Sequence, residues 1–362
     1  MGGRYAHIDA ARAIAALLVI WQHCAEMFVV LALSVRHGWM AEVANAADFG
    51  RLGVVLFFAI SGYVIPWSLR EGEAGAGRTF VIRRVFRLFP AYWLSIPLAV
   101  IGVWNVVGQA FPLRDLLLNF TMIAEVLGAR PALGLYWTLA YELGFYVLCL
   151  GLWRGGLLHR PWTMLILALG AIGLAGALLV ASVGLRKSEL GAIAVSCLNY
   201  GAMFAGACWR RWQDGGYPRP SQRVAGALCL GGWLIALPLG CAAVWLFSGR
   251  HNDFFVRVPA SYGGALLAFL LLTTVWKISW RPLAWVGLVS YSLYLFHPVV
   301  LYPVVQVLRG AAHVDVALLT ALTAGLSIGL AAIVYYAVER PGVALGRKLS
   351  TPRSRLELKP AQ

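Results

Sequence analysis

The sequence predicts an all-α polytopic membrane protein, with about ten transmembrane helices in one bundle and both termini in the cytoplasm. Of its 362 residues, 60% are hydrophobic and only 12% are charged, whereas an ordinary soluble domain carries about 25% charged residues. The mean hydropathy is +0.75. The apolar residues form long runs, and a backbone in lipid must satisfy its own hydrogen bonds, so each run is expected to be a helix. These observations exclude a water-soluble globule.

Ten runs reach the length of about 17 residues that a membrane-spanning helix requires. They cover residues 10–33, 52–69, 91–108, 135–153, 162–184, 188–209, 224–246, 259–276, 284–308 and 315–338. A further stretch, 113–128, is too short and too charged to cross, and we expect an interfacial or re-entrant helix there. The loops are too short for another folded domain. Residues 1–341 are therefore interpreted as one membrane domain, and residues 342–362 as a basic, disordered cytoplasmic tail.

The basic residues predict the orientation of the chain. Placing both termini inside puts 21 of the 30 lysines and arginines on the cytoplasmic side, as the positive-inside rule requires. The net charge of +15 is divided among short clusters between apolar runs, which argues against a nucleic-acid-binding stripe. The six cysteines form no C-x-x-C pair, and no metal-binding cluster is visible, so we expect no metal.

The first span carries a polar stripe. Arg12 and His23 are eleven residues apart, which places them on one helix face about 16 Å apart along the axis. Asp9 and Glu26 fall near the same side. A neutral His23 imidazole could take a proton from a hydroxyl, with Glu26 or Glu142 fixing its tautomer. The alternative is a histidine that is only hydrogen-bonded within the core.

The second span contains the step Ser61-Gly62 followed by Pro66. A small-residue step allows close helix approach, and the proline permits a local break in the helix. No G-x-S-x-G motif surrounds the serine, which argues against a serine nucleophile. Packing is therefore the favoured reading of this step, with Ser61 kept as a candidate substrate-binding residue.

A basic and aromatic cluster precedes the third span, in RTFVIRRVFRLFPAYW (residues 78–93). Arg84 and Arg87 are three residues apart and share a helix face, and Arg83 is adjacent. Guanidinium groups bind phosphates bidentately, so a phosphorylated cytosolic ligand could bind here. The alternative is a topology signal whose arginines reach lipid phosphates.

Two later spans also carry polar side chains. The fourth span places Tyr141 and Glu142 a few residues into an apolar helix, and an ionisable group there is expected to face a polar cavity. The ninth span has Ser290 and His297 in the sequence SYSLYLFHP. For His297, a structural role in the bundle core is slightly favoured over a functional one.

These segments together resemble the acyltransferase-3 family of integral-membrane O-acyltransferases. The matching segments are HIDAARAIAALLVIWQH (7–23), GVVLFFAISGYVI (53–65), RRVFRLFPAYW (83–93), WTLAYELGFY (137–146), SYSLYLFHP (290–298) and ERP (339–341). They follow the order that the family shows. The chain departs from the usual pattern at Ala11 and Ala13, which replace leucine and glycine, and at Thr138, which replaces serine. These changes bear on helix packing more than on activity.

The resemblance implies an enzyme of the bacterial inner membrane. It would move an acyl group, commonly acetyl, from cytosolic acyl-CoA to a hydroxyl of a glycan or another cell-envelope or secreted acceptor. By the same resemblance His23 is the catalytic histidine, Arg12 and Glu142 belong to the catalytic set, and Arg84 and Arg87, with Arg83 beside them, bind CoA. The candidate substrate-binding residues are Ser61, Tyr141, Ser290 and His297.

Several alternatives stay open at this point. His23 either deprotonates the acceptor for direct attack or carries the acyl group itself. A protein with ten spans and a polar stripe could also export a sugar polymer or a lipid-linked glycan. The expected partners are the lipid bilayer, the glycan or lipid-linked acceptor and a second copy of the chain.

Overall fold

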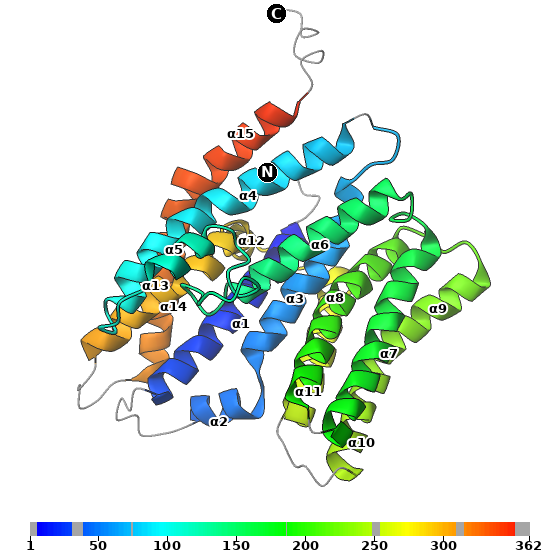
Figure 1. The fold of residues 1–362 in the computed structure, drawn as a ribbon, viewed down its shortest axis with the longest axis horizontal. Helices are drawn as coiled ribbons and strands as arrows, with labels where there is room; N and C mark the ends of the chain where they lie inside the picture. The colour runs from blue at the N-terminus through cyan, green and yellow to red at the C-terminus, as the bar shows by residue number, and fades with distance from the viewer. Residues whose placement is uncertain are drawn as a thin grey trace, which may run out of the picture. The chain divides into compact units, whose positions relative to one another are not determined.

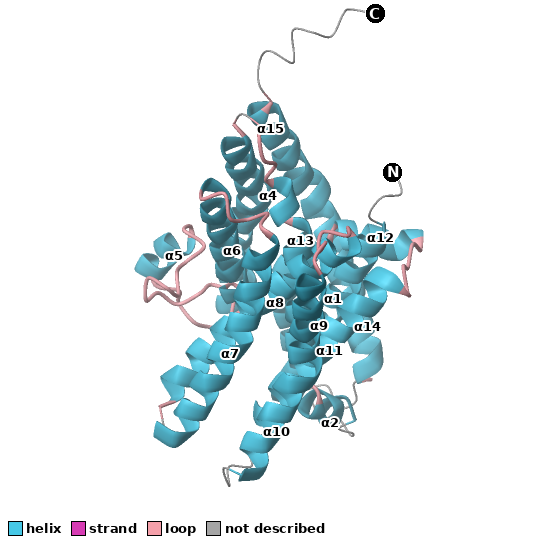
Figure 2. Ribbon diagram, turned by 90° about the vertical axis from the view of Figure 1, so that its right-hand side faces the viewer, coloured by secondary structure: helices cyan, strands magenta, loops and turns pink. Residues whose placement is uncertain are grey.

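The computed structural model describes residues 6–30, 39–73, 75–185, 187–247, 254–308 and 315–351. Within these ranges every regular element is a helix and none is a strand (Figures 1 and 2). In the same part of the chain, nine helices are long and apolar enough to cross a membrane. The predicted all-α, multi-pass membrane fold is therefore confirmed.

One predicted span is not apolar enough to be counted among these nine helices. Helix α6 (Trp137–Arg154) lies where the fourth span, 135–153, is predicted, and it is 18 residues long. It carries Glu142 and Arg154 together with two tyrosines, which lower its hydropathy, and it is not among the nine helices. The difference between ten predicted spans and nine arises from this helix.

The described chain divides into two compact units, which are considered separately. The first unit takes its residues from 1–30, 35–66 and 141–288. Its helices are α1 (Ala6–Val30), α2 (Trp39–Ala46), α3 (Phe49–Val64), most of α6, α7 (Pro161–Leu185), α8 (Ser188–Gln213), α9 (Pro220–Gly231), α10 (Leu237–Phe247), α11 (Phe254–Thr274) and α12 (Arg281–Leu288). The second unit, from 67–140 and 289–351, holds α4 (Ala76–Ala99), α5 (Leu113–Asn119), the start of α6, α13 (Ser290–Leu308), α14 (Val316–Val334) and α15 (Arg340–Ser350).

In the first unit, α3 and α8 cross with their backbones in contact. A Cβ atom added to Gly62 would lie 1.6 Å from the carbonyl oxygen of Met203, and one added to Gly206 would lie 2.0 Å from that of Ala59. Only glycine fits at such a crossing, which is how small residues pack membrane helices. The α-helix ends at Val64, and a 3₁₀ turn at Pro66–Ser68 follows. The close approach and the local break are both as the sequence predicts.

In the second unit, α15 lies beside α4 (Figure 1). A Cβ atom on Gly346 would come within 2.6 Å of the Phe86 side chain. Arg83 Nε donates to Ser350 Oγ at 3.0 Å. The prediction of a disordered tail from residue 342 does not hold for residues 342–350, because this packing on α4 stabilises a helix that its basic composition conceals. Residues 352–362 of the predicted tail lie outside the described residues.

The segment 113–128 is helical only over its first seven residues, α5, and continues in turns. Asn119 is fully buried and donates to the carbonyl groups of Asp115 and Arg130, at 2.7 and 2.8 Å. By contrast, Leu113 and Leu117 are 68% and 61% exposed. The helix thus buries Asp115 and Asn119 and exposes two leucines together with Arg114, whereas a helix in water would bury its leucines. This pattern agrees with an element at the lipid boundary.

Candidate active site

The predicted site residues are divided between the two units. In the first unit, His23 is half-buried near the end of α1. The carboxylates of Glu26 and Asp48 both act electrostatically on its imidazole. Of the two carboxylates that the sequence offers as its partner, Glu26 lies three residues after His23 on α1, whereas Glu142 lies on α6 and accepts a hydrogen bond from Tyr146.

Asp48 is a residue that the sequence analysis missed. It is the N-cap of α3, where its side chain accepts a hydrogen bond from the Arg51 backbone N–H at 2.8 Å and pairs with Arg51 Nε at 2.9 Å. An aspartate immediately before an apolar helix is the usual N-cap signal. The sequence therefore contained the N-cap signal of Asp48, but it did not indicate that Asp48 lies near His23.

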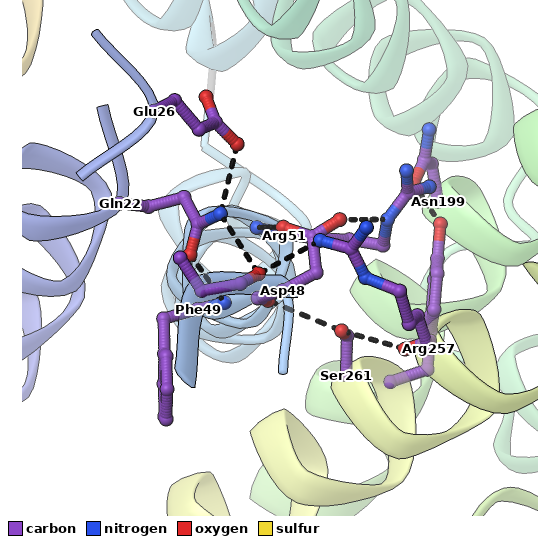
Figure 3. A network of polar contacts seen from close by, with 10 residues as sticks. Gln22, Glu26, Asp48, Phe49, Arg51, Asn199, Arg257 and Ser261 are labelled. Atoms are coloured by element: carbon purple, nitrogen blue, oxygen red, sulfur yellow. Dashed lines mark hydrogen bonds and ion pairs between the residues drawn. The ribbon is translucent and has the colours of Figure 1, made fainter. Parts of the chain in front are cut away.

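Gln22, next to His23, holds this end of α1 in place (Figure 3). It is only 2% exposed. Its Nε2 donates to Glu26 Oε1 at 2.8 Å and to the carbonyl oxygen of Ala44 at 3.3 Å. Its Oε1 accepts from the backbone N–H of Phe49 at 3.2 Å. Gln22 thereby joins α1 to the end of α2 and the start of α3, and it fixes one carboxylate beside His23.

Helix α11 completes this network (Figure 3). Arg257 Nη2 donates to the Ala44 carbonyl oxygen at 2.9 Å, and Ser261 Oγ donates to the carbonyl oxygen of Asp48 at 3.1 Å. Tyr262 donates to the side-chain oxygen of Asn199 on α8. Four helices therefore supply polar groups around the start of α3, and the short α2 is tied to them through its last turn.

Arg12 lies towards the other end of α1. It forms an ion pair with Asp9 at 3.5 Å, and the two side chains are 25% and 30% exposed. Because about 16 Å of helix separates Arg12 from His23, Arg12 does not orient the imidazole directly. The predicted shared face is present, but the two residues act at different depths of the helix.

Tyr141 and Glu142 make separate contacts on α6. The Tyr141 hydroxyl lies 2.5 Å from Ser196 Oγ, and its ring packs near those of Phe58 and Tyr200, with centroids 6.0 and 5.2 Å away. Glu142 accepts a hydrogen bond from the Tyr146 hydroxyl.

Ser61 is half-buried near the C-terminal end of α3. Its carbonyl oxygen accepts the backbone N–H of Ile65 at 2.9 Å. That bond closes the last turn of the helix before the break at Pro66.

In the second unit, the three arginines of α4 diverge. Arg83 reaches Ser350 as described above. Arg84 Nη2 donates to Ser68 Oγ at 2.9 Å, and its guanidinium lies 5.3 Å from the centroid of the Phe80 ring. Arg87 Nη1 lies 3.8 Å from Glu339 Oε1. Arg84 and Arg87 are both half-buried, whereas Arg83 is exposed.

Ser290 and His297 are core residues of α13, with exposures of 4% and 0%. Nδ1 of His297 lies 2.7 Å from the carbonyl oxygen of Tyr294. The Tyr294 hydroxyl lies 2.9 Å from Thr138 Oγ1. This burial favours the structural alternative for His297. Within the described residues, no group of three or more His, Cys, Asp or Glu side chains is arranged to hold a metal ion.

The fold and these clusters define a multi-pass helical membrane protein with ionisable groups inside its spans, a combination typical of membrane-embedded enzymes and transporters. The chain belongs to the acyltransferase-3 family, since the family model, described as an acyltransferase domain, matches residues 5–337. It is therefore a membrane acyltransferase, and this membership sets aside the exporter alternative.

Two curated proteins of rhizobia are similar to the chain. The exopolysaccharide production protein ExoZ of Rhizobium meliloti (strain 1021) is 27% identical over 315 residues, which cover 82% of this chain and 91% of that protein. Nodulation protein 10 of Rhizobium leguminosarum bv. viciae is 28% identical over 194 residues, which cover 47% of this chain and 50% of that protein. No solved structure matches the chain.

Proposed function

We propose that this protein transfers an acyl group, acetyl in the first instance, from cytosolic acyl-CoA to a hydroxyl of a polysaccharide or related cell-envelope glycan. The proposal includes a bacterial inner-membrane location with both termini in the cytoplasm. The name of ExoZ, a protein of exopolysaccharide production that the match covers almost completely, supports a polysaccharide acceptor. One structural observation carries the proposal, namely a half-buried His23 whose imidazole feels the charges of Glu26 and Asp48, in a chain of this family.

In the proposed reaction the His23 imidazole accepts the proton of the acceptor hydroxyl while the hydroxyl oxygen attacks the thioester carbonyl. The C–S bond then breaks, and the departing CoA sulfur takes the proton from the imidazolium. Glu26 and Asp48 would stabilise the positive charge on the ring between these two steps. An acyl-histidine route would use the same residue as nucleophile, with the ester formed in a second transfer.

The donor phosphates are proposed to bind at Arg84 and Arg87. Arg84 and Arg87 are both half-buried and three residues apart on α4, and arginine forms paired, charge-assisted hydrogen bonds with phosphates such as those of CoA. The ion pair of Arg87 with Glu339, at 3.8 Å, is longer than a direct hydrogen bond.

The double variant Arg84→Ala/Arg87→Ala is expected to bind acetyl-CoA about tenfold to a hundredfold more weakly than the wild type, because it loses charge-assisted hydrogen bonds. Equilibrium binding of acetyl-CoA to the purified protein in nanodiscs measures this change. Arg78→Ala, at an exposed position on the same helix, removes a like charge and should bind as the wild type does. Unchanged binding by the double variant would contradict the donor site, and absence of binding by the wild type would contradict the proposed function.

Glu26→Gln is expected to reduce the rate of CoA release by about tenfold, which is less than the 10²–10⁴-fold contribution of a general acid–base group because Glu26 acts only through His23. Glutamine keeps the size of the side chain and can still bond to Gln22, so the loss would report the missing charge beside His23. Glu142→Gln, on α6 beside Tyr146, should cause the smaller loss. The assignment of Glu26 fails if the two losses are reversed.

A further inference from the structure

Three segments that are far apart in the sequence meet in the second unit. Arg87 comes from the Arg-x-x-Arg pair of α4, Ser292 from the SYSLY segment of α13, and Glu339 from the ERP segment. Ser292 Oγ donates to Glu339 Oε2 at 2.8 Å, and Arg87 Nη1 lies 3.8 Å from Glu339 Oε1. The proposed function gives no role to Ser292 or to Glu339.

The carboxylate is the fixed member of this group. Glu339 and Ser292 are both 0% exposed, whereas the Arg87 side chain is 35% exposed. Burying a carboxylate is costly unless it is paired and hydrogen-bonded. Because Ser292 holds Oε2, Oε1 is directed towards Arg87. The fixed, buried carboxylate of Glu339 therefore attracts the partly exposed guanidinium of Arg87 towards Oε1.

The backbone on both sides of this contact is also well defined. Glu339 is the last residue of a π-helical turn, Tyr335–Glu339, between α14 and α15. Such single turns of wider helix are frequent at functional sites. The Tyr291 hydroxyl donates to the carbonyl oxygen of Leu88 at 2.8 Å, which ties α13 to α4 at the residue after Arg87. The backbone next to Arg87 and the carboxylate of Glu339 are thus held by separate contacts, of which the one to Glu339 is fully buried.

We propose that Glu339 is a positioning residue for the acyl donor, which holds the Arg87 guanidinium in the orientation that receives a donor phosphate. This inference rests on the proposed function, because it requires that Arg87 binds the phosphate. An arginine without its partner would sample more rotamers, and ordering it on binding would cost affinity. Glu339 thereby acts on the donor only through Arg87.

Glu339→Gln tests the inference, since glutamine keeps the volume and a hydrogen bond to Ser292 but removes the charge. The dissociation constant for acetyl-CoA is expected to rise about threefold to tenfold, the cost of ordering one long side chain. The rate of CoA release at saturating acetyl-CoA should change by less than about twofold, because a positioning residue for the donor phosphate affects ground-state and transition-state binding alike.

A double-mutant cycle separates this role from a general structural one. In an Arg87→Ala background, Glu339→Gln should have no further effect on acetyl-CoA binding, whereas in an Arg84→Ala background it should keep its full effect. Equal effects in both backgrounds, or no effect in the wild type, would overturn the inference. If Glu339→Gln does not fold, Ser292→Ala replaces it in the same cycle, because it releases Oε2 and leaves the charge in place.

The same data distinguish the two levels of the proposal. If the wild type does not bind acetyl-CoA, the proposed function fails. If the wild type binds and Arg87→Ala weakens binding, but Glu339→Gln has no effect, the function stands and only the role of Glu339 is rejected.

Discussion

His23→Ala is expected to reduce acyl transfer by about 10²–10⁴-fold, the range for removing a general acid–base group. Binding of acetyl-CoA and the melting temperature should change little. The imidazole is half-buried, and the hydrogen bonds of the neighbouring Gln22 to Glu26, Ala44 and Phe49 stay in place in this variant. The measurement is CoA release by the protein in nanodiscs, with acetyl-CoA as donor and a soluble polysaccharide as acceptor.

Two variants sharpen the test of His23. His23→Gln keeps a polar side chain of similar length that cannot accept a proton near neutral pH, so it should be as inactive as the alanine variant. His159→Ala removes another half-buried histidine, between α6 and α7, whose main-chain carbonyl oxygen accepts a hydrogen bond from Arg211 and is kept in the alanine variant. It should remain active. Undiminished transfer by His23→Ala would rule out the assigned role.

The membrane fold was predictable from the sequence because a spanning helix leaves a local signal, a long apolar run. Helix α15 left no such signal. Its basic residues, Arg340, Arg347 and Lys348, suggest a solvated tail, whereas its packing on α4, with Gly346 against Phe86 and Ser350 bonded to Arg83, stabilises it as a helix. Helices that tertiary contacts stabilise are the ones that sequence patterns miss.

In the candidate site, too, local features were predictable from the sequence and tertiary contacts were not. The polar stripe of Arg12 and His23 was predictable because both residues lie on one helix, where spacing defines the face. The choice of Glu26 over Glu142 and the contribution of Asp48 were not, since they depend on how α3 and α6 pack. The contact of Arg87 with Glu339 joins residues that no periodicity relates. Sequence resemblance placed both in recognisable segments without indicating that they meet.

Gly62→Ala is expected to destabilise the protein by about 3 kcal/mol, the upper end of the range for overpacking. The added Cβ atom would lie 1.6 Å from the carbonyl oxygen of Met203. That atom belongs to a helix backbone and cannot move aside as a flexible side chain would, so α3 and α8 must separate. The expected results are a lower melting temperature in detergent and a smaller monodisperse fraction.

Gly170→Ala is the matched control, because Gly170 lies on α7 of the same unit and a Cβ atom there would meet nothing within 4 Å. It should leave the melting temperature unchanged or raise it, since alanine favours helix by up to about 1 kcal/mol.

Gly62→Ala should also lower transfer in the fraction that folds. The helix that it displaces, α3, has Asp48 as its N-cap and donates the Phe49 backbone N–H to Gln22 Oε1. If the Gly62→Ala variant folds with wild-type stability, the backbones of α3 and α8 are not packed as closely as we infer. If it also keeps wild-type transfer, α3 can shift without disturbing the surroundings of His23.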